Sequence, residues 1–173
     1  MKKLAIIFIG LFAMTFAFNT VSAQNSATEA GATAAANIIA PITVEQVTGL
    51  HFGDIVPSAT AGDVIVSSGG ARTNPDGNVT LMTQLTTHSA AQFKVTGTDG
   101  STYTINLPAN NSVVLTGAGT DIPVKDFEFT GDETIGATPA GEDLFTVGAT
   151  LEVGISQAAG VYTGTYAVTV TYD

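Results

Sequence analysis

The 173-residue chain contains no cysteine and no tryptophan, and only two histidines, His51 and His88. Without cysteine, the sequence excludes disulfide bonds, thiol catalysis and the lipidated cysteine that anchors bacterial lipoproteins. Zinc sites need three or four ligands, and neither histidine has a ligand partner nearby in sequence. No acid–base or nucleophile set can be assembled for a secreted hydrolase. The sequence therefore predicts a protein that is not an enzyme and that has no catalytic residues, cofactor or metal site.

Basic residues are scarce, with five Lys and Arg against 15 Asp and Glu. Two of the five, Lys2 and Lys3, precede a nearly unbroken apolar run from Leu4 to Phe18. Loss of this N-terminal segment would leave three basic and 15 acidic residues, a formal net charge of −12. Because such a surface repels nucleic acid and anionic lipid, neither is an expected partner.

The N-terminal segment has the organisation of a secretory signal peptide. The basic start and apolar run are followed by Val21-Ser22-Ala23, the small residues that signal peptidase requires, so cleavage is expected between Ala23 and Gln24. The apolar run is shorter than the roughly 20 residues of a membrane-spanning helix. We therefore expect export through the periplasm to the cell surface, a fimbrium or the medium, without membrane insertion after cleavage. Residues 24–31 are expected to form a flexible lead-in, and residues 32–173 a single domain.

Apolar residues alternate with small or polar ones along the rest of the chain, with Gly, Pro, Asn and Asp between the alternating stretches. This period of two predicts an all-β protein, an antiparallel two-sheet sandwich of roughly eight to ten strands. We expect a first strand over Ala34–Val44, at a sheet edge because Pro41 cannot donate to a ladder. Asp99-Gly100 predicts a hairpin turn. A change of phase between the apolar residues before and after Lys125-Asp126 predicts a bulge at these two residues. The alternation of apolar residues also predicts a penultimate strand over Ala149–Ile155.

The segment from Gly160 to Asp173 has the clearest alternation. Val161 and a series of threonines occupy one side, and the other side holds Tyr162, Tyr166, Val168, Val170 and Tyr172. We expect a long strand that is paired along its full length, with the tyrosines and valines against a dry interior.

The stretch from Thr130 to Asp143 is acidic and rich in glycine, which predicts a loop. Its acidic residues, Asp132, Glu133, Glu142 and Asp143, could offer oxygens to calcium, but their spacing does not match the calcium-loop repeat. Adjacent carboxylates also cannot flank a glycosidic bond. A solvated loop is the favoured interpretation, and calcium is the alternative.

Three phrases in order, ANIIAPITVEQVTGLHFGDI, FKVTGTDGSTYTINLP and TVGATLEVGISQAAGVYTGTYAVTVTY, resemble a secreted bacterial family known as domain of unknown function 4402. That family is similar to the spore coat U domain, the subunit type of archaic chaperone–usher pili. The shared feature is the ending, here Gly160, Tyr162-Thr163, Val168 to Thr171 and Tyr172.

The resemblance implies an immunoglobulin-like, pilin-like sandwich that serves as a noncatalytic surface or fimbrial structural subunit. In such pilins one strand is missing, and the N-terminal extension of the next subunit fills the groove by strand addition. The candidate strand-addition contacts here are Ala34, Ala36, Ile38, Ile42 and Val44; alternatively this segment completes its own domain. The implied partners are further copies, other surface subunits and a periplasmic chaperone. The alternative function is a monomeric adhesive or carbohydrate-binding module.

Overall fold

The computed structural model describes residues 27–83, 85–137 and 140–173. The predicted signal peptide and its cleavage point at Ala23 and Gln24 lie outside these residues. The chain divides into two compact units, Met1–Asn37 and Ile38–Asp173. The described part of the first unit contains no helix or strand. No described segment forms a helix of the length and apolarity that a bilayer span requires.

The second unit is built from antiparallel strands, and its described residues contain no α-helix. In chain order the strands are β1 (Thr43–Thr48), β2 (Ile55–Val56), β3 (Gly62–Val66), β4 (Arg72–Thr73), β5 (Thr80–Leu81), β6 (Ala91–Thr96), β7 (Tyr103–Asn106), β8 (Val113–Leu115), β9 (Ile122–Thr130), β10 (Gly136–Ala137), β11 (Ala140–Val153) and β12 (Thr169–Tyr172). The all-β prediction is confirmed, although several strands are only two residues long.

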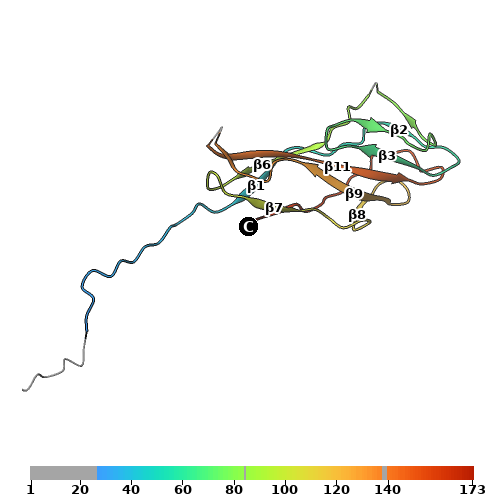
Figure 1. Ribbon diagram of the computed structural model, residues 1–173. Helices are drawn as coiled ribbons and strands as arrows, with labels where there is room; N and C mark the ends of the chain where they lie inside the picture. Colours follow the sequence, from blue (N-terminus) through green and yellow to red (C-terminus); the bar gives the residue numbers. More distant parts are fainter. Residues whose placement is uncertain (1–26, 84, 138–139) are drawn as a thin grey trace, which may run out of the picture. The chain divides into compact units, whose positions relative to one another are not determined.

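Strand β11 organises the largest sheet and runs along the folded unit (Figure 1). One edge of β11 pairs first with β6 and then with β3, while the other edge pairs with β9. β1 extends the sheet beyond β6, β4 extends it beyond β3, and β8 pairs with β9. β7 pairs with β12, and β2 pairs with β5. The result is a curled antiparallel sheet with two short additional ladders.

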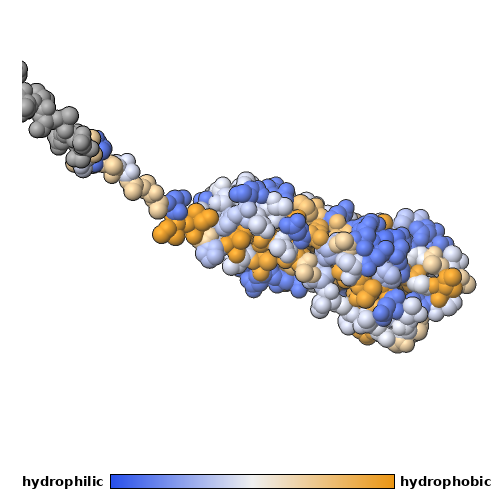
Figure 2. Space-filling model, turned by 90° about the horizontal axis from the view of Figure 1, so that it is seen from below, coloured by the Kyte–Doolittle hydropathy of each residue, from blue (hydrophilic) through white to orange (hydrophobic). Residues whose placement is uncertain are grey.

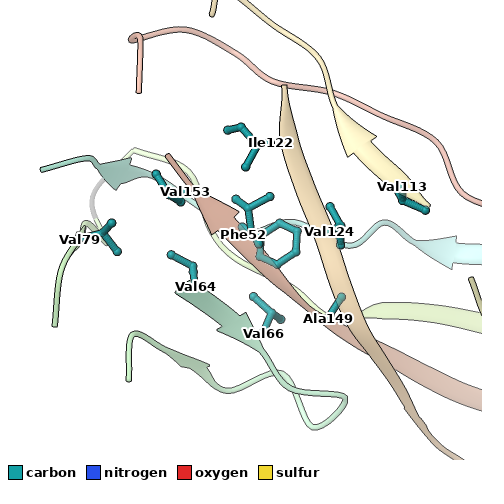
Figure 3. Packing of buried hydrophobic residues seen from close by; sticks show 10 residues of the cluster. Phe52, Val64, Val66, Val79, Val113, Ile122, Val124, Ala149 and Val153 are labelled. Atoms are coloured by element: carbon teal, nitrogen blue, oxygen red, sulfur yellow. The ribbon is translucent and has the colours of Figure 1, made fainter. Parts of the chain in front are cut away.

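The interior consists of two apolar clusters. Figure 3 shows the first, in which Phe52 lies among side chains of β3, β9 and β11. The second is aromatic: the Phe93 and Phe145 rings stack at 5.2 Å, and Tyr166 approaches Phe93 edge-on at 6.4 Å. Leu50, Phe127 and Tyr166 pack against both clusters and join them.

The predicted bulge between β9 and β11 is confirmed. The register between β9 and β11 shifts between Gly148 and Thr150 of β11. Asp126 lies opposite this shift on β9, and its φ is +50°. Ile122 and Val124 before the bulge are buried, and the two phenylalanines after it, Phe127 and Phe129, pack against the core. The extra residue restores the inward phase, as the sequence pattern required.

Three predicted elements were wrong in extent or pairing. The first strand begins at Thr43 and not at Ala34, because the alanine-rich residues before Pro41 bury too little apolar surface to offset ordering. Asp99-Gly100 does reverse the chain, but β6 and β7 then pair with other strands and form no hairpin. The penultimate strand, β11, spans Ala140–Val153, whereas Ile155 is 67% exposed outside it.

The predicted acidic loop and closing strand also need correction. Ile135, within the expected loop, is fully buried, and β10 pairs with β11 there. In the closing segment the two-faced alternation is confirmed, because its tyrosines and valines from Tyr162 to Tyr172 pack on the core, but they are only half-buried. Only Thr169–Tyr172 forms a ladder, and Thr163 makes one further bridge with Thr116. The prediction of full-length pairing was therefore wrong.

Gly148 lies where the partner of β11 changes from β6 to β3. A Cβ at Gly148 would lie 2.3 Å from the Val66 carbonyl oxygen and 2.4 Å from the Ser67 carbonyl carbon, atoms of the backbone that cannot move aside. Gly148→Ala is therefore expected to lower the free energy of unfolding by about 1–3 kcal/mol, as overpacking does. Denaturant unfolding measures this change. Gly69→Ala is the control, since its Cβ would only touch the Ser67 hydroxyl at 3.8 Å; equal midpoints for the two variants would contradict the prediction.

Candidate functional site: an apolar groove beside the C-terminal segment

A groove of about 490 Å³ opens between two segments that are mostly outside the ladders. One wall is Leu50–Ile55, which connects β1 to β2, and the other is Gln157–Tyr166. The floor consists of side chains from β8, β9 and β11, namely Val113, Leu115, Ile122, Val124, Leu151 and Val153. The groove thus opens onto the first core cluster, and its floor is apolar.

The Leu50–Ile55 wall is held by the Arg72 side chain of β4 and by the backbone of Thr86. The Arg72 guanidinium donates to the carbonyl oxygens of Phe52 (2.9 Å), Asp54 (3.4 Å) and Met82 (2.5 Å). The Asp54 carboxylate accepts from the Thr86 backbone N–H, which holds the pKa of this carboxyl below its usual value. The wall therefore has a defined position, although residues 52–54 belong to no strand.

The opposite wall exposes a length of unpaired backbone. Between the Thr163 bridge and the start of β12, residues 164–168 belong to no ladder formed by the described residues. Tyr166 and Val168 nevertheless pack on the core, so this stretch keeps the side-chain alternation of a strand. Unpaired strand-like backbone beside an apolar floor is a template for another strand.

Tyr166 carries a buried polar atom at this site. Its ring packs against Phe93 and Phe127, and its hydroxyl has no hydrogen-bond partner among the described residues. Burial raises the pKa of the hydroxyl to about 12. By contrast, the Tyr103 hydroxyl donates to Asp143 at 2.7 Å. Burial is the larger cause and this hydrogen bond the second cause that raise the pKa of Tyr103 far above the usual range.

The polar residues singled out in the sequence are not brought together. His51 is exposed, and its Nδ1 accepts from the Gly53 N–H. Glu142 lies 3.9 Å from the Lys94 ammonium, while the neighbouring Asp143 accepts from Tyr103. Over the described ranges no three His, Asp or Glu side chains are grouped as a metal site would require.

The five candidate strand-addition contacts fall into two groups. Ile42 and Val44 pack against the second core cluster of their own domain. Ala34, Ala36 and Ile38 are exposed, Ile38 by 93%, and none lies in a strand. The groove itself could not be predicted from the sequence. Its floor and walls come from several separate segments between residues 50 and 166, and only strand pairing brings these segments together. The unpaired stretch had one visible signal, the Gly164 that interrupts the tyrosine–valine face.

A family model described as "Domain of unknown function (DUF4402)" matches residues 42–172. The chain belongs to this family. The DUF4402 domain of this protein extends from the residue before β1 to the end of β12, so it contains both walls and the floor of the groove. Residues 27–41 lie outside the match. Comparison with curated proteins and with solved structures gave no significant match.

On the face seen in Figure 2, hydrophobic areas are scattered among hydrophilic ones. All three basic residues of the domain are engaged by their own chain. Lys94 pairs with Glu45 and Glu142, Lys125 pairs with Asp63 and Glu152, and Arg72 binds the carbonyl oxygens of the groove wall. The Glu152 hydrogen bond raises the pKa of Lys125.

The hydroxyl groups of Tyr166 and Tyr103 lead to opposite predictions at neutral pH. Tyr166→Phe removes a hydroxyl without a partner, so the free energy of unfolding should stay the same or rise by up to about 1 kcal/mol. Tyr103→Phe leaves Asp143 without its donor and should lower that free energy by about 1 kcal/mol. Urea unfolding of both variants at pH 7 measures these changes. A larger loss in the Tyr166 variant would show that its hydroxyl has a partner.

The raised pKa values also predict a pH dependence. A tyrosine with a folded pKa above its unfolded value of 10.0 holds its proton more tightly in the folded protein. Its contribution to stability is present below pH 10 and is lost as the pH rises from 10 through about 12. The midpoint of thermal unfolding should therefore fall over this range, and it should fall less steeply in Tyr166→Phe. Parallel curves for the wild type and this variant would contradict the assignment.

Proposed function

We propose that this DUF4402 protein is a noncatalytic, secreted structural subunit of the cell surface or of a fimbrium, and that copies assemble by strand addition. The observation that carries the proposal is the groove, in which an apolar floor lies beside the unpaired backbone of residues 164–168. Strand addition requires both features, because main-chain bonds supply affinity and the floor accommodates alternate side chains. The predicted signal peptide supports export.

The fold we propose is an immunoglobulin-like, pilin-like sandwich with one strand position open. The β7–β12 pair and the β1–β6–β11 ladder both contribute to the aromatic cluster around Phe93, Phe145 and Tyr166, as two facing layers would. The groove lies where a further strand would pair with residues 164–168. The short ladders and the exposed stretch of backbone are then features of a domain that is completed from outside.

The proposed occupant is the N-terminal segment of a second copy. Residues 30–44 contain no charged side chain, although the chain is strongly acidic, so this segment enters an apolar groove without burying a charge. Its residues up to Ile42 form no strand, and residues 31–39 are exposed. Ala34, Ala36 and Ile38 share one phase and would face the floor, while Thr33, Asn37 and Ile39 would face outward.

A matched pair of variants tests this phase. Ile38→Asp places a charge against the apolar floor of the partner and should reduce assembly by at least 100-fold. Ile39→Asp adds the same charge on the outward face and should assemble nearly as the wild type does. Size-exclusion chromatography and unheated denaturing gels of the chain from Gln24 onward measure the oligomers. Because Ile38 is 93% exposed, its substitution should not change the unfolding midpoint of the monomer fraction. Equal assembly of the two variants would contradict the proposed contacts.

The Ile38→Asp chain also provides an assay for the groove alone, since it lacks a working donor and keeps the acceptor. It should bind a fluorescent peptide of residues 30–44 saturably, and it should not bind the same peptide carrying Ile38→Asp. Fluorescence anisotropy measures the binding. Wild-type chains that stay monomeric and bind no peptide would rule out strand addition; selective sugar binding on a glycan array would instead favour an adhesive or carbohydrate-binding module.

A further inference from the structure

The C-terminal segment uses the backbone groups of its odd-numbered residues to bind its neighbours. Thr163 exchanges two hydrogen bonds of 2.9 Å with Thr116, which directly follows β8. At the other end β12 pairs with β7, and the Asp173 N–H donates to the Thr102 carbonyl oxygen at 3.3 Å (Figure 1). Thr163 and Asp173 therefore turn their backbone groups toward the chain that contains β7 and β8.

The alternation continues without interruption between these two ends. From residue 161 to residue 173 every odd-numbered residue is exposed, and every even-numbered residue except Gly164 is half-buried. A bulge would reverse this pattern, and no reversal occurs. In an antiparallel strand, residues that bond to a given neighbour alternate with residues that do not. The even-numbered residues therefore turn their N–H and C=O groups to the opposite edge of the segment.

Hydrogen bonds of β7 confirm this direction within β12. Val170 lies opposite Ile105 in the ladder. The Ile105 N–H, however, donates to the Glu133 carboxylate at 3.4 Å, and the Tyr103 N–H donates to the Glu133 carbonyl oxygen at 3.0 Å. Because these two residues of β7 turn their N–H groups away from β12, Val170 and Ile105 form a non-hydrogen-bonded pair. The free edge thus continues beyond residue 168 into β12.

β1 closes this edge at Tyr172. β1 lies against β12, and the Tyr172 hydroxyl donates to the Ala40 carbonyl oxygen at 2.8 Å just before β1 begins.

Four residues remain with backbone groups that point to the free edge, and we call them the pairing edge: Gly164, Tyr166, Val168 and Val170. Among the described residues, no ladder or isolated bridge uses their N–H and C=O groups. The first two line the groove, and the last belongs to β12. An extended edge of this kind is a template for a further strand.

We infer that an added strand hydrogen-bonds to the C-terminal segment through the pairing edge, and that it runs from the groove onto β12. This inference rests on the proposed function and extends its binding site to Val170. The pairing edge spans seven positions, from residue 164 to residue 170. Residues 30–40 of a second copy are eleven consecutive residues without charge or proline, so they can cover this length and donate at every position.

Proline variants test the direction of the edge in the Ile38→Asp chain, with the fluorescent peptide of residues 30–44 as the probe. Val168→Pro removes an N–H of the pairing edge and places its ring there, so it should weaken binding by roughly tenfold or more. Ala167→Pro removes an N–H that points to the opposite edge and should leave binding unchanged. Val168→Ala keeps the N–H and controls for the lost side chain, so it should bind more tightly than Val168→Pro. Fluorescence anisotropy measures all three.

Amide hydrogen exchange, resolved by NMR, is a second measurement that needs no proline. Saturation of the Ile38→Asp chain with the same peptide should slow exchange by at least about tenfold at Tyr166, Val168 and Val170, because their N–H groups become bonded. The amides of Thr165 and Ala167 should exchange as they do in the free protein. A general stiffening of the segment would instead slow odd and even positions alike.

Two results would overturn the inference and leave strand addition in place. One is peptide binding that Val168→Pro and Ala167→Pro weaken equally or not at all. The other is protection that includes the odd-numbered amides or stops before Val170. If the Ile38→Asp chain binds no peptide and the wild type does not assemble, strand addition itself fails, and the role of the pairing edge fails with it.

Discussion

The structure depends on the double pairing of β11. This one strand is hydrogen-bonded to β9 along one edge and to β6 and β3 in succession along the other, so it connects both halves of the sheet. The change of partner is sterically possible because Gly148 leaves room for the backbone of Ser67. Both apolar clusters include side chains of β11: Phe145 and Val147 belong to one, and Ala149, Leu151 and Val153 to the other. The long strand thereby joins the two cores.

The groove follows from the same arrangement. The side chains of β8, β9 and β11 that form the floor are apolar, so their exposure to water is unfavourable. No strand paired within the sheet lies over them among the described residues. The two covering segments, Leu50–Ile55 and Gln157–Tyr166, remain apart and are held by side-chain bonds. An unpaired strand edge is normally an aggregation hazard that proteins block with charges or proline. Here, no charged residue lies between Gly160 and Tyr172, which is consistent with an edge kept for pairing.

Much of the local structure could be predicted from the sequence, because a period of two reports directly which side chains face inward. The bulge near Asp126 was predictable for this reason, since only an extra residue brings both the Ile122–Val124 pair and the two phenylalanines inward. Pairing was not predictable, because alternation does not say which strand lies alongside. Asp99-Gly100 looks like a hairpin turn, but β6 pairs with β1 and β11. The buried Ile135 was missed because its acidic and glycine-rich neighbours dominate the local composition.

The internal use of all three basic side chains in the described residues has a consequence beyond one molecule. Since Lys94, Lys125 and Arg72 each bind groups of their own chain, the described domain offers a neighbour no unengaged cation to balance its carboxylates. Wherever many copies are packed together, small cations from the medium must gather between them to neutralise the excess negative charge. A layer or fibre of this protein would then behave as a polyelectrolyte, drawing in counterions and water and swelling as the surrounding ionic strength falls.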